Sequence, residues 1–305
     1  MIPFYIVTGW LGSGKTTLLK NILTHYGNSY RIAVIQNEFA PTGVDGKELQ
    51  NTGTAFKLVE INNGSVFCVC QLGNFVEALE QLADSYTPDA IFLESSGLAD
   101  PISVVQILNA PAIKDKINLK KIITVIDAVH FERTFQMMPR FKHQVMVADQ
   151  LIINKSEEPG TSSQSVVGLL KKWNPFADYK FSNYCNINLK DLFDDDAAMG
   201  KSRRFLPIIN AGNKPEMNVS VLRVHDLISE TQLTEFIQEL LPSSYRIKGF
   251  VNTSEGNTIA IQAVLETIEF ARVEKYEGRS ELIIFNNQYS NHELEQRFKA
   301  KVLHV

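Results

Sequence analysis

Cysteine is scarce in this sequence. Its 305 residues include only 3 cysteines, Cys68, Cys70 and Cys185, and an odd, sparse set of this kind does not predict a disulfide framework. No apolar run is long enough to span a bilayer. The first residues lead straight into a motif without a basic segment, so no signal peptide is expected. We therefore expect a cytoplasmic protein without a membrane partner.

Positive charge is not in excess either. The sequence has 30 Lys and Arg residues against 34 Asp and Glu residues, which gives a net charge of −4. Because binding to a phosphate backbone favours a basic protein, a nucleic-acid partner is not expected. Hydrophobic residues make up 44% of the sequence and charged residues 21%, which is typical of a globular protein with a sizeable core.

Two patterns of secondary structure follow each other along the chain. Up to about residue 185, short apolar runs alternate with amphipathic stretches, which predicts an α/β domain with a largely parallel sheet covered on both faces. Prolines, a glycine and polar residues at 206–217 indicate a linker. The later stretches predict a smaller α+β domain. The predicted division is therefore a first domain at 1–205, the linker at 206–217 and a second domain at 218–305.

The same patterns locate the individual elements. Strands are predicted at 4–8, 31–36, 56–61, 90–94, 121–126 and 150–153 in the first domain, and at 219–224, 245–251, 258–264, 268–271 and 281–285 in the second. Helices are predicted at 15–25, 75–85, 101–109, 163–173, 230–241 and 291–301, with one more between the strands at 121–126 and 150–153. The acidic cluster at 191–196 is predicted to be a solvated loop.

A glycine-rich loop connects the first predicted strand to the first predicted helix. From Gly9 to Thr16 it fits the pattern Gly-x4-Gly-Lys-Thr of a phosphate loop. Glycines let the main chain approach a ligand, successive N–H groups form an anion site, and the helix adds the positive end of its dipole. Lys15 is expected to reach the β- and γ-phosphates, and the Thr16 hydroxyl to bind Mg2+. The predicted phosphate-binding residues are Gly9, Gly12, Ser13, Gly14, Lys15, Thr16 and Thr17.

A carboxylate ends the strand predicted at 90–94. This residue, Glu94, is followed by two serines and Gly97. Phosphate-loop proteins hold Mg2+ with an acid at such a strand end, although Asp is more usual there. The backbone N–H of Gly97 is expected to meet the γ-phosphate. The alternative for Glu94 is an ordinary structural glutamate, but its place after the phosphate loop favours a catalytic group of Lys15, Thr16 and Glu94.

A candidate base-reading motif ends the strand predicted at 150–153. Its residues are Asn154, Lys155, Ser156 and Glu157, and guanine-reading GTPases carry Asn-Lys-x-Asp at this point. The acid accepts hydrogen bonds from guanine N1–H and from the exocyclic amine, whereas adenine offers neither donor. A glutamate is one methylene longer and accepts the same pair with more freedom. The motif therefore favours guanine, with a strand-end turn as the alternative.

In this order along the chain, the motifs resemble those of the CobW-like GTPases, a family often described as metallochaperones. The matching stretches are 7–19, 31–46, 60–79, 94–101, 122–131 and 144–155, followed by 245–251 and 281–285. The resemblance implies a P-loop GTPase domain followed by a CobW-like C-terminal domain. It also implies GTP hydrolysis coupled to delivery of a transition metal, such as zinc or cobalt, to a client protein.

The metal motif of that family is Cys-x-Cys-Cys after an Asn-Gly turn, and this sequence departs from it. Without a gap, only Cys68 matches a family cysteine; with a two-residue insertion, Cys68 and Cys70 match and Gln71 replaces the third. Glu38 is the further ligand that the resemblance implies. Two thiolates two residues apart can share one soft metal, although a tetrahedral site needs further ligands. The alternative is that both cysteines are small buried residues on or near a strand.

The motifs predict a GTPase that uses Mg2+, and the resemblance implies that it binds Zn2+ or Co2+ at Cys68, Cys70 and Glu38. Its expected partners are GTP or GDP, the transition metal, an unidentified client metalloprotein and, to accelerate a slow intrinsic turnover, a second copy of the chain. Two alternatives are an ATP-dependent P-loop ATPase or kinase and a non-catalytic adaptor that binds nucleotide. The motif from Asn154 to Glu157 distinguishes a GTPase from the first alternative. Release of phosphate distinguishes a GTPase from the second.

Overall fold

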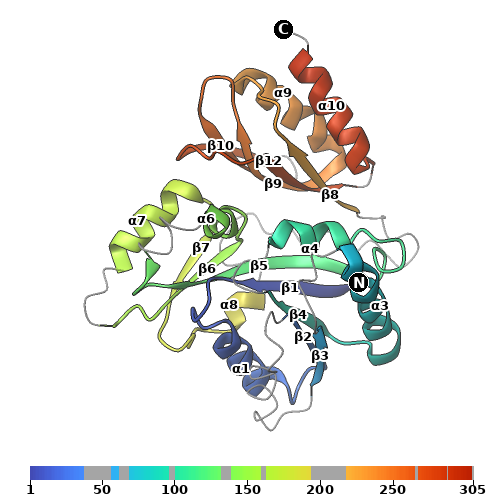
Figure 1. The fold of residues 1–305 in the computed structure, drawn as a ribbon, viewed down its shortest axis with the longest axis vertical. Helices are drawn as coiled ribbons and strands as arrows, with labels where there is room; N and C mark the ends of the chain where they lie inside the picture. The colour runs from blue at the N-terminus through green and yellow to red at the C-terminus, as the bar shows by residue number, and fades with distance from the viewer. Residues whose placement is uncertain are drawn as a thin grey trace.

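The computed structural model of the chain has two packed lobes, each built on its own β-sheet (Figure 1). The N-terminal lobe comprises the described residues up to 193, and the C-terminal lobe those from 218. The structure describes residues 1–37, 56–61, 69–95, 100–131, 139–158, 163–193, 218–264, 267–286 and 288–303. The predicted linker at 206–217 lies outside these ranges.

Parallel strands form the sheet of the N-terminal lobe. Its described strands are β1 (Ile2–Thr8), β2 (Ile32–Asn37), β3 (Lys57–Ile61), β4 (Ala90–Glu94), β5 (Ile117–Asp127), β6 (Gln150–Asn154) and β7 (Asp178–Phe181). They lie in the order β3-β2-β4-β1-β5-β6-β7, so that β1 is central and pairs with β4 and β5. The central strands are almost entirely apolar because both faces of the sheet are covered. Their carboxyl ends meet at one edge, where ligands bind in sheets of this kind.

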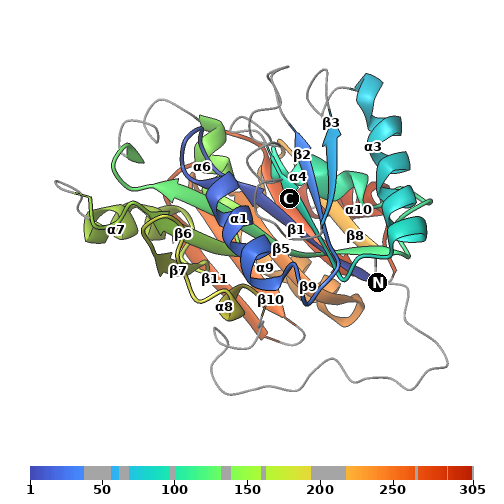
Figure 2. The same cartoon turned by 90° about the horizontal axis from the view of Figure 1, so that it is seen from below.

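Helices cover both faces of this sheet (Figure 2). The helices concerned are α1 (Lys15–Tyr26), α3 (Val69–Gln81), α4 (Pro101–Ile107), α6 (Pro139–Met146), α7 (Ser163–Trp173) and α8 (Lys190–Phe193). On one face, Leu18 and Leu19 of α1 and Leu192 of α8 pack with Val7 and Phe92 of the sheet. The helices α3, α4, α6 and α7 supply the core of the other face.

The sheet of the C-terminal lobe is antiparallel, in the order β11-β10-β9-β12-β8. Its strands are β8 (Asn218–Val224), β9 (Ser244–Asn252), β10 (Thr258–Val264), β11 (Thr267–Val273) and β12 (Ser280–Asn286). The helices α9 (Glu230–Leu240) and α10 (Asn291–Leu303) pack on one face. A capping box between Ser229 and Gln232 starts α9, which satisfies backbone N–H groups in its first turn.

The other face of this second sheet packs against the N-terminal lobe. Val221 of β8, Phe250 of β9 and Ile283 of β12 belong to the same buried cluster as residues of α4 and α6. Figure 1 shows α4 between the two sheets, below β8. The two lobes therefore share one continuous apolar core.

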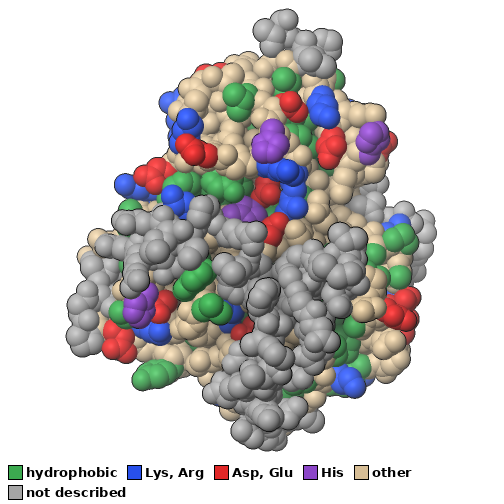
Figure 3. Space-filling view, in the orientation of Figure 1, with side chains coloured by type: hydrophobic (Ala, Val, Ile, Leu, Met, Phe, Trp, Pro, Cys, Tyr) green, Lys and Arg blue, Asp and Glu red, His purple; other side chains and the backbone are tan. Residues whose placement is uncertain are grey.

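Charged side chains line the junction of the lobes beside α4. Arg223 of β8 donates to Asp100 at 2.5 Å and lies 3.0 Å from Glu281 of β12. His143 of α6 pairs with Glu281 and lies 3.4 Å from Asp100. Burial by itself would raise the pKa of Asp100, but the charges of His143 and Arg223 outweigh it and lower this pKa. Acidic, basic and histidine side chains gather where the lobes meet in Figure 3.

A second ionic cluster joins the lobes at the amino ends of the strands, centred on Asp149 just before β6. Lys248 of β9 donates to the Asp149 carboxylate at 2.7 Å and to the carbonyl of Val147 at 2.6 Å. Arg246 also pairs with Asp149. The backbone N–H of Ile122 donates to the other carboxylate oxygen at 2.7 Å. This carboxylate, whose side chain is only 9% exposed, is thus surrounded by donors, as burial of a charge requires.

Most predicted elements are present, and three differ. The helix predicted at 75–85 begins earlier, at Val69, and is followed by a π-helical turn at Leu82–Tyr86. Cys70 therefore lies in the first turn of a helix, and not on a strand as one alternative had it. The loop predicted at 191–196 contains the end of α8, since buried Leu192 anchors a short helix there. The strand β7 was not predicted. In the described parts of the chain, no helix is long and apolar enough to cross a membrane.

Candidate nucleotide-binding site

The predicted phosphate loop lies at the carboxyl edge of the central strand and runs directly into α1. Gly9, Gly12 and Gly14 have φ angles of +135°, +74° and +110°, which residues with a Cβ rarely adopt. A Cβ on Gly9 would collide with the carbonyl of Val125 in β5, and one on Gly14 would lie 2.5 Å from Asn154 Nδ2. The loop is therefore pressed against the ends of β5 and β6.

Lys15 opens α1 and folds over this loop. Its Nζ donates to the carbonyls of Gly9 at 3.0 Å and Trp10 at 3.2 Å. The first N–H groups of α1 and its dipole point towards the same place. Thr16 and Thr17 follow in the first turn. This arrangement of a lysine, backbone N–H groups and a helix N-terminus is suited to a polyphosphate.

Glu94 ends β4 and reaches the first turn of α1. Thr16 Oγ1 donates to Glu94 Oε1 at 2.7 Å, so the two residues predicted to hold Mg2+ are in direct contact. A residue that the sequence did not single out joins them: Gln36 Nε2 of β2 donates to Glu94 Oε2 at 2.8 Å. The strand register sets Gln36 directly opposite Glu94.

Asn154, the first residue of the predicted base-reading motif, links this motif to the phosphate loop. Its Nδ2 donates to the carbonyl of Ser13 at 2.8 Å. Its Oδ1 accepts from the backbone N–H of Cys185 at 2.9 Å and from Ser182 Oγ at 3.2 Å. The loop after β7 therefore belongs to the site, although sequence reasoning missed it. The serine and asparagine after the Asp178–Phe181 stretch were its only local signal.

Cys185 of this loop packs directly under the phosphate loop. Its Sγ donates to the carbonyl of Gly14 at 3.3 Å, and its side chain is buried in the core on the α1 side. Burial raises the pKa of the thiol to about 12, so at neutral pH it is a protonated, structural cysteine.

Asp127 is a second strand-end acid that the sequence did not single out. It ends β5, and its Oδ2 accepts from Lys155 Nζ at 2.7 Å. Its Oδ1 accepts from the backbone N–H of Val129 at 3.0 Å and of His130 at 3.3 Å. Burial would raise the pKa of Asp127, but the hydrogen bond from Lys155 and the other donors lower it. This ion pair fixes Lys155, whose φ of +59° turns the chain after β6.

Glu157, the acid of the motif, is exposed to solvent two residues beyond Lys155. Its backbone N–H donates to Asn183 Oδ1 at 3.3 Å, which adds to the bonds that Asn154 and Ser156 make to the loop after β7. The Glu157 carboxylate therefore lies on a turn that is held by the ion pair of Lys155 with Asp127 and by the loop after β7.

The predicted transition-metal site falls mostly outside the described residues. Glu38 and Cys68 lie there, and of Cys70 only the backbone, in the first turn of α3, is described. Gly97, which is predicted to meet the γ-phosphate, also lies outside the described residues. Within the described ranges, no three His, Cys, Asp or Glu side chains are grouped as metal ligands would be.

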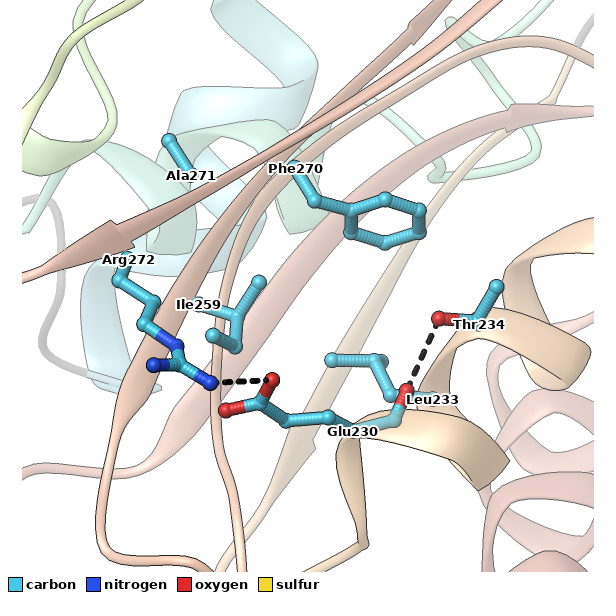
Figure 4. Close-up of a pocket in the computed structure, with 7 residues that line it drawn as sticks. All are labelled: Glu230, Leu233, Thr234, Ile259, Phe270, Ala271 and Arg272. Atoms are coloured by element: carbon cyan, nitrogen blue, oxygen red, sulfur yellow. Dashed lines mark hydrogen bonds and ion pairs between the residues drawn. The ribbon is translucent and has the colours of Figure 1, made fainter.

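A cavity of about 250 Å³ lies away from these residues, between α9 and the edge of the second sheet (Figure 4). Leu233, Ile259 and Phe270 supply its apolar wall. Glu230 and Arg272 face each other across it at 3.0 Å, so the cavity holds a neutralised ion pair and no free charge of either sign among its lining side chains.

Comparison with known protein families identifies the family to which the chain belongs. The CobW/HypB/UreG nucleotide-binding domain matches residues 3–179. The C-terminal domain of the cobalamin synthesis protein cobW matches residues 217–302. The chain belongs to the CobW family. Its phosphate loop, Glu94 and the motif from Asn154 all fall within the first match.

Several curated proteins are similar to this CobW-family chain. The zinc chaperone CobW of Pseudomonas aeruginosa is 33% identical over 186 residues, which are 52% of this chain and 49% of that protein. The zinc chaperone YeiR of Escherichia coli is 31% identical over 169 residues, 55% of this chain and 50% of that protein. The zinc-regulated GTPase metalloprotein activator 1 of Saccharomyces cerevisiae is 27% identical over 278 residues, 79% of this chain and 64% of that protein. The chain spans about half the length of the first curated relatives that it matches.

A solved structure has the same fold over nearly the whole chain. The Zn(II)-bound YjiA GTPase of Escherichia coli superposes with a TM-score of 0.52 and 21% sequence identity, covering 98% of both chains. The expected architecture, a P-loop NTPase-like parallel sheet followed by a second lobe, is thereby confirmed.

Proposed function

We propose that this chain binds GTP with Mg2+, hydrolyses it and couples the hydrolysis to delivery of a transition metal, zinc or cobalt, to a client protein. The observation that carries the proposal is the contact of the Thr16 hydroxyl with the Glu94 carboxylate, at 2.7 Å, beside Lys15. Membership of the CobW family, whose similar members include zinc chaperones and a zinc-regulated GTPase, supports the metal part of the proposal.

The donor set fits the cofactor. A hydroxyl and a carboxylate are hard oxygen ligands of the kind that Mg2+ prefers. While the Thr16 hydroxyl donates its hydrogen bond to Glu94, the lone pairs of Oγ1 remain available to a cation. Bound Mg2+ would offset the negative charge of the β- and γ-phosphate oxygens. Lys15 and the loop N–H groups would stabilise the charge that develops on the transferred phosphoryl group.

Guanine selectivity is the second part of the proposal. Asn154 ties the base-reading turn to the phosphate loop through Ser13, so base and phosphates would be held by one connected set of residues. Glu157 is exposed on that turn and would accept from guanine N1–H and the exocyclic amine. Adenine would leave this carboxylate unpaired, which weakens its binding.

Nucleotide hydrolysis is tested with Lys15→Ala. The variant loses the cation nearest the phosphates, so we expect the single-turnover rate of GTP hydrolysis to fall by about 100-fold. Lys20→Ala, on the same helix but away from the loop, is the control. A large excess of ATP should not displace labelled GTP from the wild-type protein. Equal rates for Lys15→Ala and wild type, or equal competition by ATP, would contradict this assignment.

Metal handling is tested by linkage. If Cys68, Cys70 and Glu38 bind a transition metal and respond to the nucleotide, Zn2+ or Co2+ affinity must differ between the complexes with a GTP analogue and with GDP, and nucleotide affinities must shift by the same factor. Cys68→Ser should weaken metal binding, whereas Cys185→Ala should not. Identical metal affinities in both nucleotide states would contradict the proposed coupling between metal binding and nucleotide binding.

The proposed macromolecular partners are a client metalloprotein and a second copy of the chain, acting in the cytoplasm. Sedimentation of the protein with GDP, with a GTP analogue and with Zn2+ tests the second copy, because a dimer that depends on the nucleotide must change the sedimentation coefficient.

A further inference from the structure

We propose that Gln36 is a positioning residue for the magnesium site. Its amide holds the Glu94 carboxylate in the orientation that receives the Thr16 hydroxyl, and it thereby sets the affinity of the nucleotide complex for Mg2+. The inference rests on the proposed function, because it concerns the cation of that same site. Three observations carry it: the hydrogen bonds of Glu94, the burial of Gln36, and the register of β2 with β4.

Both oxygens of Glu94 are engaged, each from a different direction. Thr16 Oγ1 donates to Oε1 at 2.7 Å, and Gln36 Nε2 donates to Oε2 at 2.8 Å. A glutamate has one more side-chain torsion than the aspartate more usual at this strand end, so more contacts are needed to fix its carboxylate. Gln36, rooted in the neighbouring strand, supplies one of these contacts at the oxygen that Thr16 does not bind.

Gln36 is an exception in its strand. The four residues before it in β2, from Ile32 to Ile35, are apolar and buried, and Gln36 itself is only 1% exposed. Its Oε1 is buried without a hydrogen-bond partner, which costs free energy that an apolar side chain would not cost. Packing alone therefore does not account for a glutamine here, whereas donation to a carboxylate that is 7% exposed does.

The register makes the contact rigid. Gln36 pairs with Glu94 across two parallel strands, so the two side chains project from neighbouring backbone positions on the same face of the sheet. Gln36 also lies two residues before Glu38, the predicted transition-metal ligand. The same strand thus contributes the group that orients the magnesium carboxylate and leads to the predicted metal ligand.

The experiment measures Mg2+ affinity without relying on turnover. In Gln36→Leu, the release rate of a fluorescent GDP analogue is followed against Mg2+ concentration. We expect the half-saturating Mg2+ concentration to rise about tenfold, equivalent to ~1.4 kcal/mol. Release in the absence of Mg2+ should be unchanged, because Gln36 is not expected to touch the nucleotide. Gln36→Met, an unbranched side chain of similar length, replaces the first variant if it fails to fold.

Gln150 provides a matched control in the same sheet. It is also 1% exposed, its Nε2 donates to the Asp178 carboxylate at 3.2 Å, and its Oε1 is likewise buried without a partner. It lies at the amino end of β6, away from the nucleotide edge. Gln150→Leu should leave the Mg2+ dependence unchanged.

The outcomes separate this inference from the proposed function. A Gln36 variant that folds and keeps the wild-type Mg2+ midpoint overturns the positioning role, as does an equal shift in the Gln150 variant. A wild-type protein whose GDP release responds to Mg2+ but which never hydrolyses GTP contradicts the proposed function and leaves the positioning role standing.

Discussion

Single residues hold distant parts of the site together, and Asn154 does so most completely. Its amide nitrogen binds the phosphate loop at Ser13, and its amide oxygen accepts from Ser182 and Cys185 in the loop after β7. All these groups are buried, so each unmade bond would cost about 1–3 kcal/mol. One side chain thus orders two loops that meet only in the folded chain.

The thiol of Cys185 gives a prediction at this scale. Because burial raises its pKa to about 12, the thiolate fraction at pH 8 is about 1,000-fold smaller than for a thiol with a pKa near 9. We expect iodoacetamide to label Cys185 at least ~100-fold more slowly in the folded protein than in urea, as measured by timed labelling and peptide mass mapping. The Cys68→Ser/Cys70→Ser variant gives an unambiguous signal. Equal labelling rates in the two states would show that the thiol is not buried.

How much of the site the sequence predicts depends on how local each signal is. Lys15, Glu94 and Asn154 sit in short motifs that follow predicted strands, and the structure brings all three to the same edge of the sheet. Gln36 reaches Glu94 across 58 positions, and Cys185 reaches Asn154 across 31. Neither residue belongs to a recognisable local motif, because the role of each depends on which strands are neighbours. The sequence predicted a largely parallel sheet but not the order of its strands.

At the scale of elements, the strand β1, the phosphate loop and the helix α1 act as one unit braced by β5 and β6. Their boundaries were predictable because an apolar run, a glycine-rich loop and an amphipathic stretch follow one another. The strand β7 was not, since its residues Asp178–Phe181 are only partly buried at the sheet edge and form no apolar run. The start of α3 was missed because Gly73 and polar residues in its first turns weaken the helical pattern.

Glycine substitutions test the bracing of this unit. In Gly14→Ala the new Cβ would lie 2.5 Å from Asn154 Nδ2 and 3.1 Å from Cys185 Sγ, with φ at +110°. We expect a loss of about 2–4 kcal/mol in the free energy of unfolding, measured with urea. Gly12→Ala is the control, because it has φ at +74° but no atom within 4 Å of the added Cβ. It should cost only about 1 kcal/mol, and equal losses would show that contact with Asn154 is unimportant.

At the scale of the whole molecule, two ionic clusters and a shared apolar core fasten the lobes. One cluster, around Asp149, lies at the amino ends of the first sheet's strands, and the other, around Arg223, lies beside α4. Buried ion pairs add little net stability over apolar packing, but losing one partner leaves a buried charge unpaired. Separation of the lobes would therefore remove the partners of Asp149 and Arg223.

Asp149 makes this docking sensitive to acid. Burial would raise its pKa, but Arg246 and Lys248 hold it below the ordinary value of 3.8. The charged carboxylate therefore contributes stability that is fully present above pH 3.8 and is lost as the pH falls below it. We expect Asp149→Asn to lose about 3 kcal/mol at pH 7 and to show a shallower decline in acid, measured by urea unfolding at a series of pH values.

The control for Asp149 is Glu239→Gln. Its partner Arg297 lies at 2.5 Å, but both side chains are 40% exposed, so solvent screens the pair and little change is expected. If the free energy of unfolding of Asp149→Asn falls as steeply in acid as that of the wild type, another group controls the loss of stability.

Asp100 links the start of α4 to the C-terminal lobe. Its Oδ1 caps α4 by accepting from the N–H of Ile102 at 2.9 Å, and its Oδ2 accepts from Arg223 of the C-terminal lobe. Fraying of α4 and separation of β8 thus break bonds to the same carboxylate. Backbone amides of α4 and β8 should consequently exchange with deuterated solvent as one cooperative unit. Protection of the α4 amides from exchange would then show whether the C-terminal lobe is docked on the N-terminal lobe.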